Sequence, residues 1–228
     1  MVKQRLKRLV QSALAKQKKV LAPTMLNLGR KRYLDVLQSE FTNEYIRLSQ
    51  LDLAIHEIKR HNVLGDVAEL GVYKGTFAAV LNGVLPDRNL YLFDTFEGFD
   101  AKQAHFDRQE LSANSEKDFS DTSVDFVLGQ MPHPHKCIVR KGLFPATAAG
   151  LEDRTFCFVS LDADLYEPIL AGLEFFFERL SPGGFIFVHD YNYAGFPGAN
   201  KAVTEFSVKR GIPFIPITDS CGTAIFRA

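Results

Sequence analysis

The sequence predicts an α/β fold with an open, mostly parallel sheet covered by helices on both faces. From residue 66 onward, short runs of β-branched and aromatic residues alternate with segments of helical periodicity. Strands that alternate with helices form βαβ units, whose crossover helices cover the sheet. The chain has 228 residues, 46% of them hydrophobic and 24% charged, which is typical of a globular protein with one large core.

The first 60 residues have the pattern of helices. A basic segment repeats apolar residues at helical spacing up to Leu14, and Pro23 interrupts it. A second periodic stretch runs from Tyr45 to Ile58, just before residues that commonly end helices. We therefore expect a basic N-terminal helical extension or lid over residues 1–60 and a sheet-containing domain over residues 61–228.

The strands and helices of the second part can be placed in order. We expect strands at Asp66–Leu70, Asn89–Phe93, Lys136–Arg140, Thr155–Leu161, Gly184–Val188, Pro213–Ile217 and Thr223–Arg227. Helical patterns lie between them at about residues 75–85, 121–130, 166–180 and 198–210. Only Thr218–Gly222 separates the last two strands, so they should form an antiparallel hairpin and not a parallel crossover.

Charge and composition exclude several classes of protein. Residues 1–34 hold ten Lys and Arg and no acid, which leaves 17 basic and 27 acidic residues, a net charge of −10, in residues 35–228. An acidic body without a recognition motif argues against nucleic-acid binding. No apolar run reaches the length of about 18 residues that a membrane span needs, and no signal peptide is recognisable, so we expect a cytoplasmic protein with no integral membrane segment.

A glycine turn follows the first strand of the expected sheet. Gly71 and Gly75 allow a tight turn and a close approach to a ligand, and the next helix offers unpaired N–H groups. The spacing is not G-x-G-x-x-G, so a dinucleotide pyrophosphate fits poorly, whereas Glu69 suits a cationic ligand. The alternative is a strand–helix turn that needs glycine only for its shape.

An acid ends the second strand. Asp94 lies 25 residues after Glu69, where a carboxylate commonly binds ribose hydroxyls. Together, these two acids point to an adenosine cofactor that carries an amino acid, and they separate it from NAD.

Two further polar clusters follow the fourth and fifth strands. Asp162 and Asp164 form the first, and His189 with Asp190 the second. The carboxyl ends of neighbouring parallel strands meet at one crevice, so we expect a metal or acid/base site there. An alternative role for Asp164 is to cap the helix that begins near Tyr166.

Several of these segments resemble the macrocin O-methyltransferase family. The matching motifs, in order, are Glu69–Gly75, Leu92–Phe99, Asp121–Val124, Lys141–Phe144, Leu161–Glu167 and Leu180–Tyr191. The resemblance covers about residues 60–228 and implies a class I methyltransferase Rossmann-like sheet of seven strands with an antiparallel last strand. It also implies methylation of sugar hydroxyls on antibiotics and other natural products, with S-adenosylmethionine and Mg²⁺ as cofactors.

The resemblance also assigns roles to individual residues. The cofactor-binding positions are Glu69, Gly71, Tyr73, Gly75, Thr76, Asp94, Thr95, Gly142 and Asp162. Asp162, His189 and Asp190 occupy the metal positions, and Asp164 matches a proposed general base. Acceptor pockets in such folds are built from N-terminal additions and loops, here residues 1–60 and 97–120.

His189 departs from the family pattern, which usually has an acid there. Carboxylates suit Mg²⁺, whereas imidazole suits Zn, Fe, Ni or Mn better. Three alternatives follow: Mg²⁺ bound by Asp162 and Asp190 alone, a softer metal, or no metal and His189 as the catalytic base.

The expected function is an S-adenosylmethionine-dependent O-methyltransferase acting on a small-molecule or glycan hydroxyl. A Rossmann-like NAD-dependent oxidoreductase and a non-catalytic S-adenosylmethionine-binding protein are the alternatives. The long N-terminal helices are compatible with a homodimer.

Overall fold

The computed structural model describes residues 44–114 and 117–228. The expected basic helix near the N-terminus lies outside these residues. Within them, no helix combines the length and the apolar character that crossing a bilayer requires.

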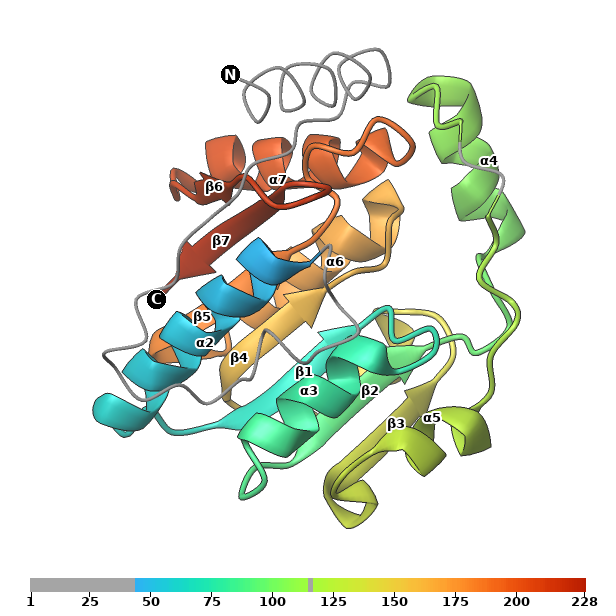
Figure 1. Cartoon of the computed structure of the whole chain (residues 1–228). Coiled ribbons are helices and arrows are strands. Elements are labelled where there is room, and N and C mark those ends of the chain that lie inside the picture. The colour runs from blue at the N-terminus through green and yellow to red at the C-terminus, as the bar shows by residue number, and fades with distance from the viewer. Residues whose placement is uncertain (1–43, 115–116) are drawn as a thin grey trace, which may run out of the picture. The chain divides into compact units, whose positions relative to one another are not determined.

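A seven-stranded sheet in the order β3-β2-β1-β4-β5-β7-β6 forms the centre of the fold (Figure 1). Its strands are β1 (Asp66–Leu70), β2 (Leu90–Asp94), β3 (Cys137–Lys141), β4 (Phe156–Leu161), β5 (Leu180–Val188), β6 (Ile215–Ile217) and β7 (Thr223–Arg227). The first five run parallel, and β7 is antiparallel to both β5 and β6. This confirms the predicted fold class, including the C-terminal hairpin.

Helices cover both faces of this sheet. They are α2 (Tyr45–Arg60), α3 (Thr76–Val84), α4 (Ala101–Glu110), α5 (Val124–Gln130), α6 (Tyr166–Phe177) and α7 (Pro197–Arg210), with 3₁₀ turns η1 (Pro134–Lys136) and η2 (Ala146–Ala148). In Figure 1, α2 and α3 lie in front of the sheet and α6 lies behind it. α2, which falls within the expected N-terminal extension, packs on β5.

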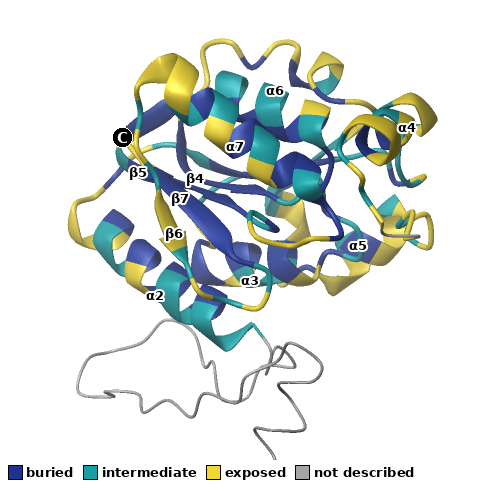
Figure 2. Cartoon of the chain, turned by 90° about the horizontal axis from the view of Figure 1, so that it is seen from above, coloured by how far each residue is buried: buried dark blue, intermediate teal, exposed yellow. Residues whose placement is uncertain are grey.

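The main apolar core lies between the sheet and the α6 and α7 layer. Ile169, Leu173 and Phe176 of α6 meet the strand side chains that point to this face. Figure 2 shows β4, β5 and β7 as buried, whereas the edge strand β6 is largely exposed. Because strand side chains alternate between faces, Ala68 and Leu70 join this core and Glu69 points to the α2 and α3 side.

The segment over residues 97–120 contains a helix that its sequence did not predict. α4 is a polar helix in which only Ala104 and Asp107 are buried. Its apolar periodicity is therefore too weak to show in the sequence. Asp100 nevertheless marks its start, because the Asp100 carboxylate accepts the N–H groups of Lys102 and Gln103.

Candidate active site

A cavity of about 460 Å³ opens where β1, β2, β4 and β5 end. Its walls come from the turns after these strands, from the start of α2 and from the segment before and after α4. Ligands of open α/β sheets bind at this edge. Every expected cofactor, metal and catalytic residue lines this cavity except two: Gly75, which is the N-cap of α3, and Gly142, whose N–H donates to the Asp94 carbonyl oxygen at 2.9 Å.

The turn after β1 requires glycine at position 71. Gly71 has a φ of +86°, and a Cβ there would overlap the carbonyl oxygen of Asp162. The two segments are joined by backbone hydrogen bonds, one of them from the Asp162 N–H to the Leu70 carbonyl at 2.8 Å. Gly75 is also left-handed and is the N-cap of α3, so this turn leads directly into a helix N-terminus that has no side-chain cap.

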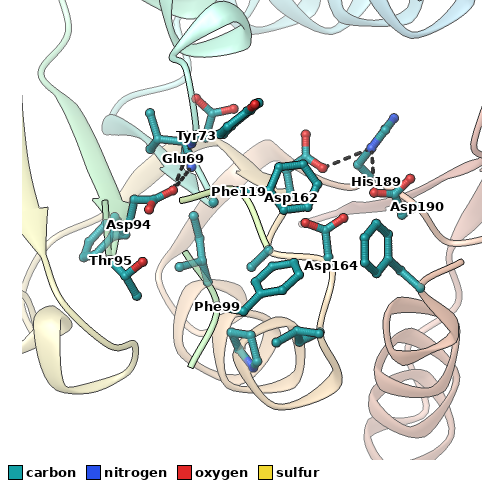
Figure 3. Close-up of a pocket in the computed structure, with 18 of the residues that line it drawn as sticks. Glu69, Tyr73, Asp94, Thr95, Phe99, Phe119, Asp162, Asp164, His189 and Asp190 are labelled. Atoms are coloured by element: carbon teal, nitrogen blue, oxygen red, sulfur yellow. Dashed lines mark hydrogen bonds and ion pairs between the residues drawn. The ribbon is translucent and has the colours of Figure 1, made fainter. Parts of the chain in front are cut away.

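Asp94 shapes this turn through its carboxylate (Figure 3). Its Oδ2 accepts the N–H groups of Val72 at 2.7 Å and Tyr73 at 2.9 Å, and its Oδ1 accepts that of Phe96 at 2.7 Å. A carboxylate has about four acceptor positions, so about one remains for a ligand hydroxyl. Thr95 is similarly engaged, because its hydroxyl donates to the Gly98 carbonyl at 2.6 Å.

Glu69 is buried beneath the cavity with an unused oxygen. The residue is 1% exposed, and its Oε2 has no hydrogen-bond partner. Burial, followed by the negative charge of Asp162, raises the pKa of Glu69 well above its ordinary value. A buried carboxyl of this kind is the complement of a cationic ligand group.

Asp162 lies between two cations. Its Oδ2 is 3.1 Å from Nη2 of Arg47, and its Oδ1 is 3.0 Å from Nδ1 of His189. Burial alone would raise the pKa of Asp162, but His189 and Arg47 together hold it well below its usual range. Asp162 is therefore an ionised carboxylate.

His189 is surrounded by acids. Its Nδ1 is 3.2 Å from Asp190, and its Nε2 is 3.6 Å from Glu44 of the segment that precedes α2. Burial lowers the pKa of His189, but Asp162 and the other acids outweigh it and raise it to about 12. These ion pairs favour the protonated, imidazolium form of His189.

The oxygens of Asp162, Asp164 and Asp190 form a compact cluster. One oxygen from each lies within 4.8 Å of the other two. Burial, followed by repulsion from Asp190 and Asp162, raises the pKa of Asp164 well above its ordinary value. Three carboxylates, two of them buried and that of Asp162 half-buried, are the donor set of a hard divalent cation such as Mg²⁺, which would also neutralise their repulsion. The residues present therefore fit that metal.

His189 also belongs to two mixed clusters, one with Asp190 and Cys221 and one with Glu44 and Asp219. Nitrogen and sulfur donors of this kind suit softer metals. The structure therefore brings together all four residues that the sequence proposed, but it places Asp164, and not His189, in the oxygen-only set.

The backbone holds two of these carboxylates in unusual conformations. Asp164 has a φ of +61° and Asp190 a φ of +56°. Left-handed conformations of this kind cost about 1–3 kcal/mol in non-glycine residues and concentrate at functional sites. The alternative role of Asp164 as a helix cap is wrong: α6 has Leu165 at its N-cap, and its Tyr166 N–H is bound by the distant Asp107 at 3.2 Å.

Aromatic rings form one wall of the cavity. Phe99 lies 5.3 Å from Phe119 and 6.0 Å from Phe196 between ring centroids, and all three line the cavity. Two nearby phenylalanines do not take part in this wall: Phe96 is buried away from the cavity, and Phe106 stacks on Tyr166.

Two charged residues of the site were missed in the sequence. Glu44 and Arg47 reach the cavity from the start of α2. Arg47 lies four residues before Leu51 and eight before Ile55, so helical spacing places it on the buried face of α2. Arginine is rarely buried without a partner, so an arginine on the apolar face of a predicted helix indicates a buried acidic partner. This was the signal that the sequence offered for Arg47.

The fold is that of the Rossmann-like class I methyltransferases. The O-methyltransferase NovP aligns with a TM-score of 0.63 over 80% of this chain and 79% of that chain, at 22% identity. The calicheamicin methyltransferase CalS11 aligns with a TM-score of 0.59 over 84% of this chain and 88% of that chain, at 21% identity.

The chain belongs to the macrocin O-methyltransferase family. The family model described as Macrocin-O-methyltransferase (TylF) matches residues 7–227, which confirms the resemblance drawn from the motifs. The chain is 26% identical over 191 residues to the 8-demethyl-8-(2,3-dimethoxy-α-L-rhamnosyl)-tetracenomycin-C 4'-O-methyltransferase of Streptomyces olivaceus, covering 79% of this chain and 72% of that protein. It is 26% identical over 179 residues to the mycinamicin III 3''-O-methyltransferase of Micromonospora griseorubida, covering 73% of this chain and 69% of that protein.

The protein is therefore an S-adenosylmethionine-dependent O-methyltransferase. This membership removes the NAD-dependent oxidoreductase from the alternatives.

Proposed function

We propose that this enzyme transfers the methyl group of S-adenosylmethionine to a sugar hydroxyl of a glycosylated small molecule, with a divalent cation bound at the acceptor end. One observation carries the proposal: a single cavity joins a glycine turn with Glu69 and Asp94 to a cluster of three carboxylates. The names of the relatives from Streptomyces and Micromonospora, which methylate glycosylated natural products, support the choice of acceptor.

The cofactor half of the cavity accounts for the polar residues near β1 and β2. The remaining acceptor position of Asp94 suits a ribose hydroxyl, and the Gly71 turn lets the backbone approach the ligand closely. Glu69 suits the positive charge of the aminoacyl end.

The acceptor half activates the hydroxyl. A divalent cation held by Asp162, Asp164 and Asp190 would lower the pKa of the acceptor hydroxyl. The cation would offset the repulsion from Asp162 and Asp190, so Asp164 would be ionised and one of its oxygens could accept a proton. We therefore assign Asp164 to accept the hydroxyl proton, as the sulfonium gives up its methyl group and becomes a neutral thioether. His189 stays protonated and holds Asp162 and Asp190 in place.

The aromatic wall suits a sugar. Phe99, Phe119 and Phe196 present apolar ring surface beside the three carboxylates. A sugar ring has an apolar C–H face and polar edges, so it would stack on these rings and turn one hydroxyl toward Asp164. The rings thereby orient the nucleophile, which converts binding into rate.

The test combines binding and turnover. Calorimetry should detect S-adenosylhomocysteine binding, and a panel of glycosides should give methylated product whose formation a chelator reduces and Mg²⁺ restores. No binding of S-adenosylhomocysteine would overturn the proposal. Binding without turnover on any glycoside would overturn the proposed sugar acceptor.

The metal set has its own test. Mn²⁺ binding followed by electron paramagnetic resonance should be lost in Asp190→Asn and Asp164→Asn but retained in His189→Gln. Asp153→Asn, an exposed charge change, is the control. Loss of Mn²⁺ in His189→Gln with retention in Asp164→Asn would instead assign Asp162, His189 and Asp190 as the ligands.

A further inference from the structure

Arg47 is a buried cation at the floor of the cofactor cavity. Its side chain is 5% exposed, and its guanidinium lies 4.0 Å above the ring centroid of Phe77 in the first turn of α3. It comes from α2, 115 residues away in the sequence from Asp162. A buried arginine normally has every donor satisfied, because an unpaired one costs free energy.

The known partners of Arg47 use only part of its guanidinium. Nη2 donates to the Ser160 hydroxyl at 3.3 Å and to Asp162 at 3.1 Å. Nε, by contrast, is buried and has no hydrogen-bond partner. His189 already pairs with the other oxygen of Asp162, so Arg47 is not the only cation that balances the Asp162 charge.

The Arg47 guanidinium and the Glu69 carboxyl lie in the same part of the site. Ser160, which Arg47 contacts, is the register partner of Glu69 between β4 and β1. Neighbouring strands are about 4.8 Å apart, and the charges of Arg47 and Glu69 act on each other, lowering the pKa of Glu69 and raising that of Arg47. Both residues line the cavity, and both the Nε of Arg47 and the Oε2 of Glu69 are buried without partners.

A donor and an acceptor in the same part of the site match an α-amino acid group. We propose that Arg47 and Glu69 together bind the aminoacyl end of the cofactor, with Arg47 Nε donating to the carboxylate and Glu69 accepting from the ammonium group. This rests on the proposed cofactor site and goes beyond it by assigning a residue of α2 to cofactor selection.

The start of α3 supports the position of the carboxylate. α3 begins at Thr76, and its N-cap Gly75 has no side chain to satisfy the first N–H groups of the helix. Helix N-termini favour negative charge, and the Arg47 guanidinium lies over Phe77 of the same turn. The ligand carboxylate would therefore meet two sources of positive potential at one place.

The test separates the aminoacyl end from the rest of the cofactor. Calorimetry compares S-adenosylhomocysteine, its decarboxylated analogue S-adenosyl-3-thiopropylamine, and 5'-methylthioadenosine, which lacks the aminoacyl group. Arg47→Met should weaken binding of S-adenosylhomocysteine by about 10- to 100-fold, the range for one charge-assisted hydrogen bond. It should leave the affinity for the other two ligands within about twofold of the wild type.

Two further variants complete the comparison. Glu69→Gln should weaken the two amine-bearing ligands and spare 5'-methylthioadenosine. Arg60→Met, an exposed arginine at the end of the same helix, should change none of the affinities. Arg47→Lys keeps the charge without the Nε donor and should fall between Arg47→Met and the wild type.

The outcomes distinguish this inference from the proposed function. Equal loss for all three ligands in Arg47→Met would assign Arg47 to the architecture of the site and overturn the inference. Unchanged binding of S-adenosylhomocysteine would overturn it as well. If the wild type binds none of the three ligands, the proposed cofactor itself fails.

Discussion

At the scale of single residues, the turn at Gly71 leaves no space for a side chain. A Cβ at this position would meet the backbone of Asp162, which cannot move without shifting the end of β4. We expect Gly71→Ala to abolish S-adenosylhomocysteine binding and to lower the unfolding free energy by more than about 1 kcal/mol. Calorimetry and urea unfolding measure the two effects.

Gly150→Ala is the matched control for this substitution. Gly150 has a similar φ of +80°, but nothing lies within 4 Å of a Cβ there. Gly150→Ala should therefore introduce similar backbone strain without a steric clash, and it should bind S-adenosylhomocysteine as the wild type does. Equal effects of the two substitutions on binding would show that steric contact with Asp162 does not matter.

His189 makes stability depend on pH. Its pKa is raised to about 12 in the folded chain, against about 6.5 when unfolded. Below about 6.5 both states carry the proton, and the ion pairs contribute fully. Above it the unfolded chain releases the proton and the folded chain keeps it, so the contribution declines as pH rises toward 12.

The difference in unfolding free energy between the wild type and His189→Gln should therefore fall between pH 7 and pH 9, by up to about 1.4 kcal/mol per pH unit. Urea unfolding at several pH values measures it. A difference that is constant or increases over this range would mean that His189 is neutral in the folded protein.

At the scale of elements, a carboxylate of α4 holds the start of α6. Asp107 is 1% exposed, and its oxygens accept the Tyr166 N–H at 3.2 and 3.3 Å. Burial raises the pKa of Asp107 to about 6, although the hydrogen bond from Tyr166 opposes this. Asp107 therefore fixes α4, which lies beside the cavity, to the start of α6.

The raised pKa of Asp107 makes stability depend on pH, because the folded and the unfolded chain release this proton at different pH values. The unfolded chain loses the Asp107 proton near pH 4, whereas the folded chain keeps it until about pH 6. As pH rises from about 4 to about 6, the contribution of Asp107 to the stability of the wild type should therefore fall. Asp107→Asn cannot titrate, so its stability relative to the wild type should increase over this range and stay constant above it. Asp153→Asn, an exposed aspartate, should show no such gain in the same thermal unfolding series.

Elements with clear periodicity were predictable from the sequence. β1 and β7 have the expected bounds, and β2 to β4 differ by one residue. β5 begins at Leu180, four residues before the expected start, because its first residues include Pro182 and two glycines that no β-propensity favours. α4 was missed because tertiary contacts of Asp107, and not an apolar stripe, hold it in place.

The site shows the same division between local and distant information. Glu69, Asp94 and Asp162 were predictable because parallel strands deliver their ends to one edge. Arg47 and the Asp107 cap were not, because each acts across a gap of more than 50 residues that only the folded chain closes. His189 was predictable as a site residue, but its protonated state depends on acids from three separate segments.

At the scale of the whole molecule, Arg47 is the link between α2 and the ends of β1 and β4. If the carboxylate of the cofactor is the missing hydrogen-bond partner of Arg47 Nε, cofactor binding should hold α2 against the sheet. Ligand binding stabilises the folded state by about 2.7 kcal/mol at 100 times the dissociation constant, and part of this gain should appear as slower local opening of α2.

Hydrogen exchange followed by mass spectrometry measures this directly. S-adenosylhomocysteine should slow amide exchange in both α2 and the Gly71 turn, whereas 5'-methylthioadenosine at equal saturation should slow it in the turn alone. In Arg47→Met, S-adenosylhomocysteine should protect the turn and leave α2 unprotected. The C-terminal part of α7, around Phe206, packs in the core with α6 on the opposite face of the sheet and serves as the internal reference. Equal protection of α2 by both ligands would mean that the cofactor stabilises the domain without passing through Arg47.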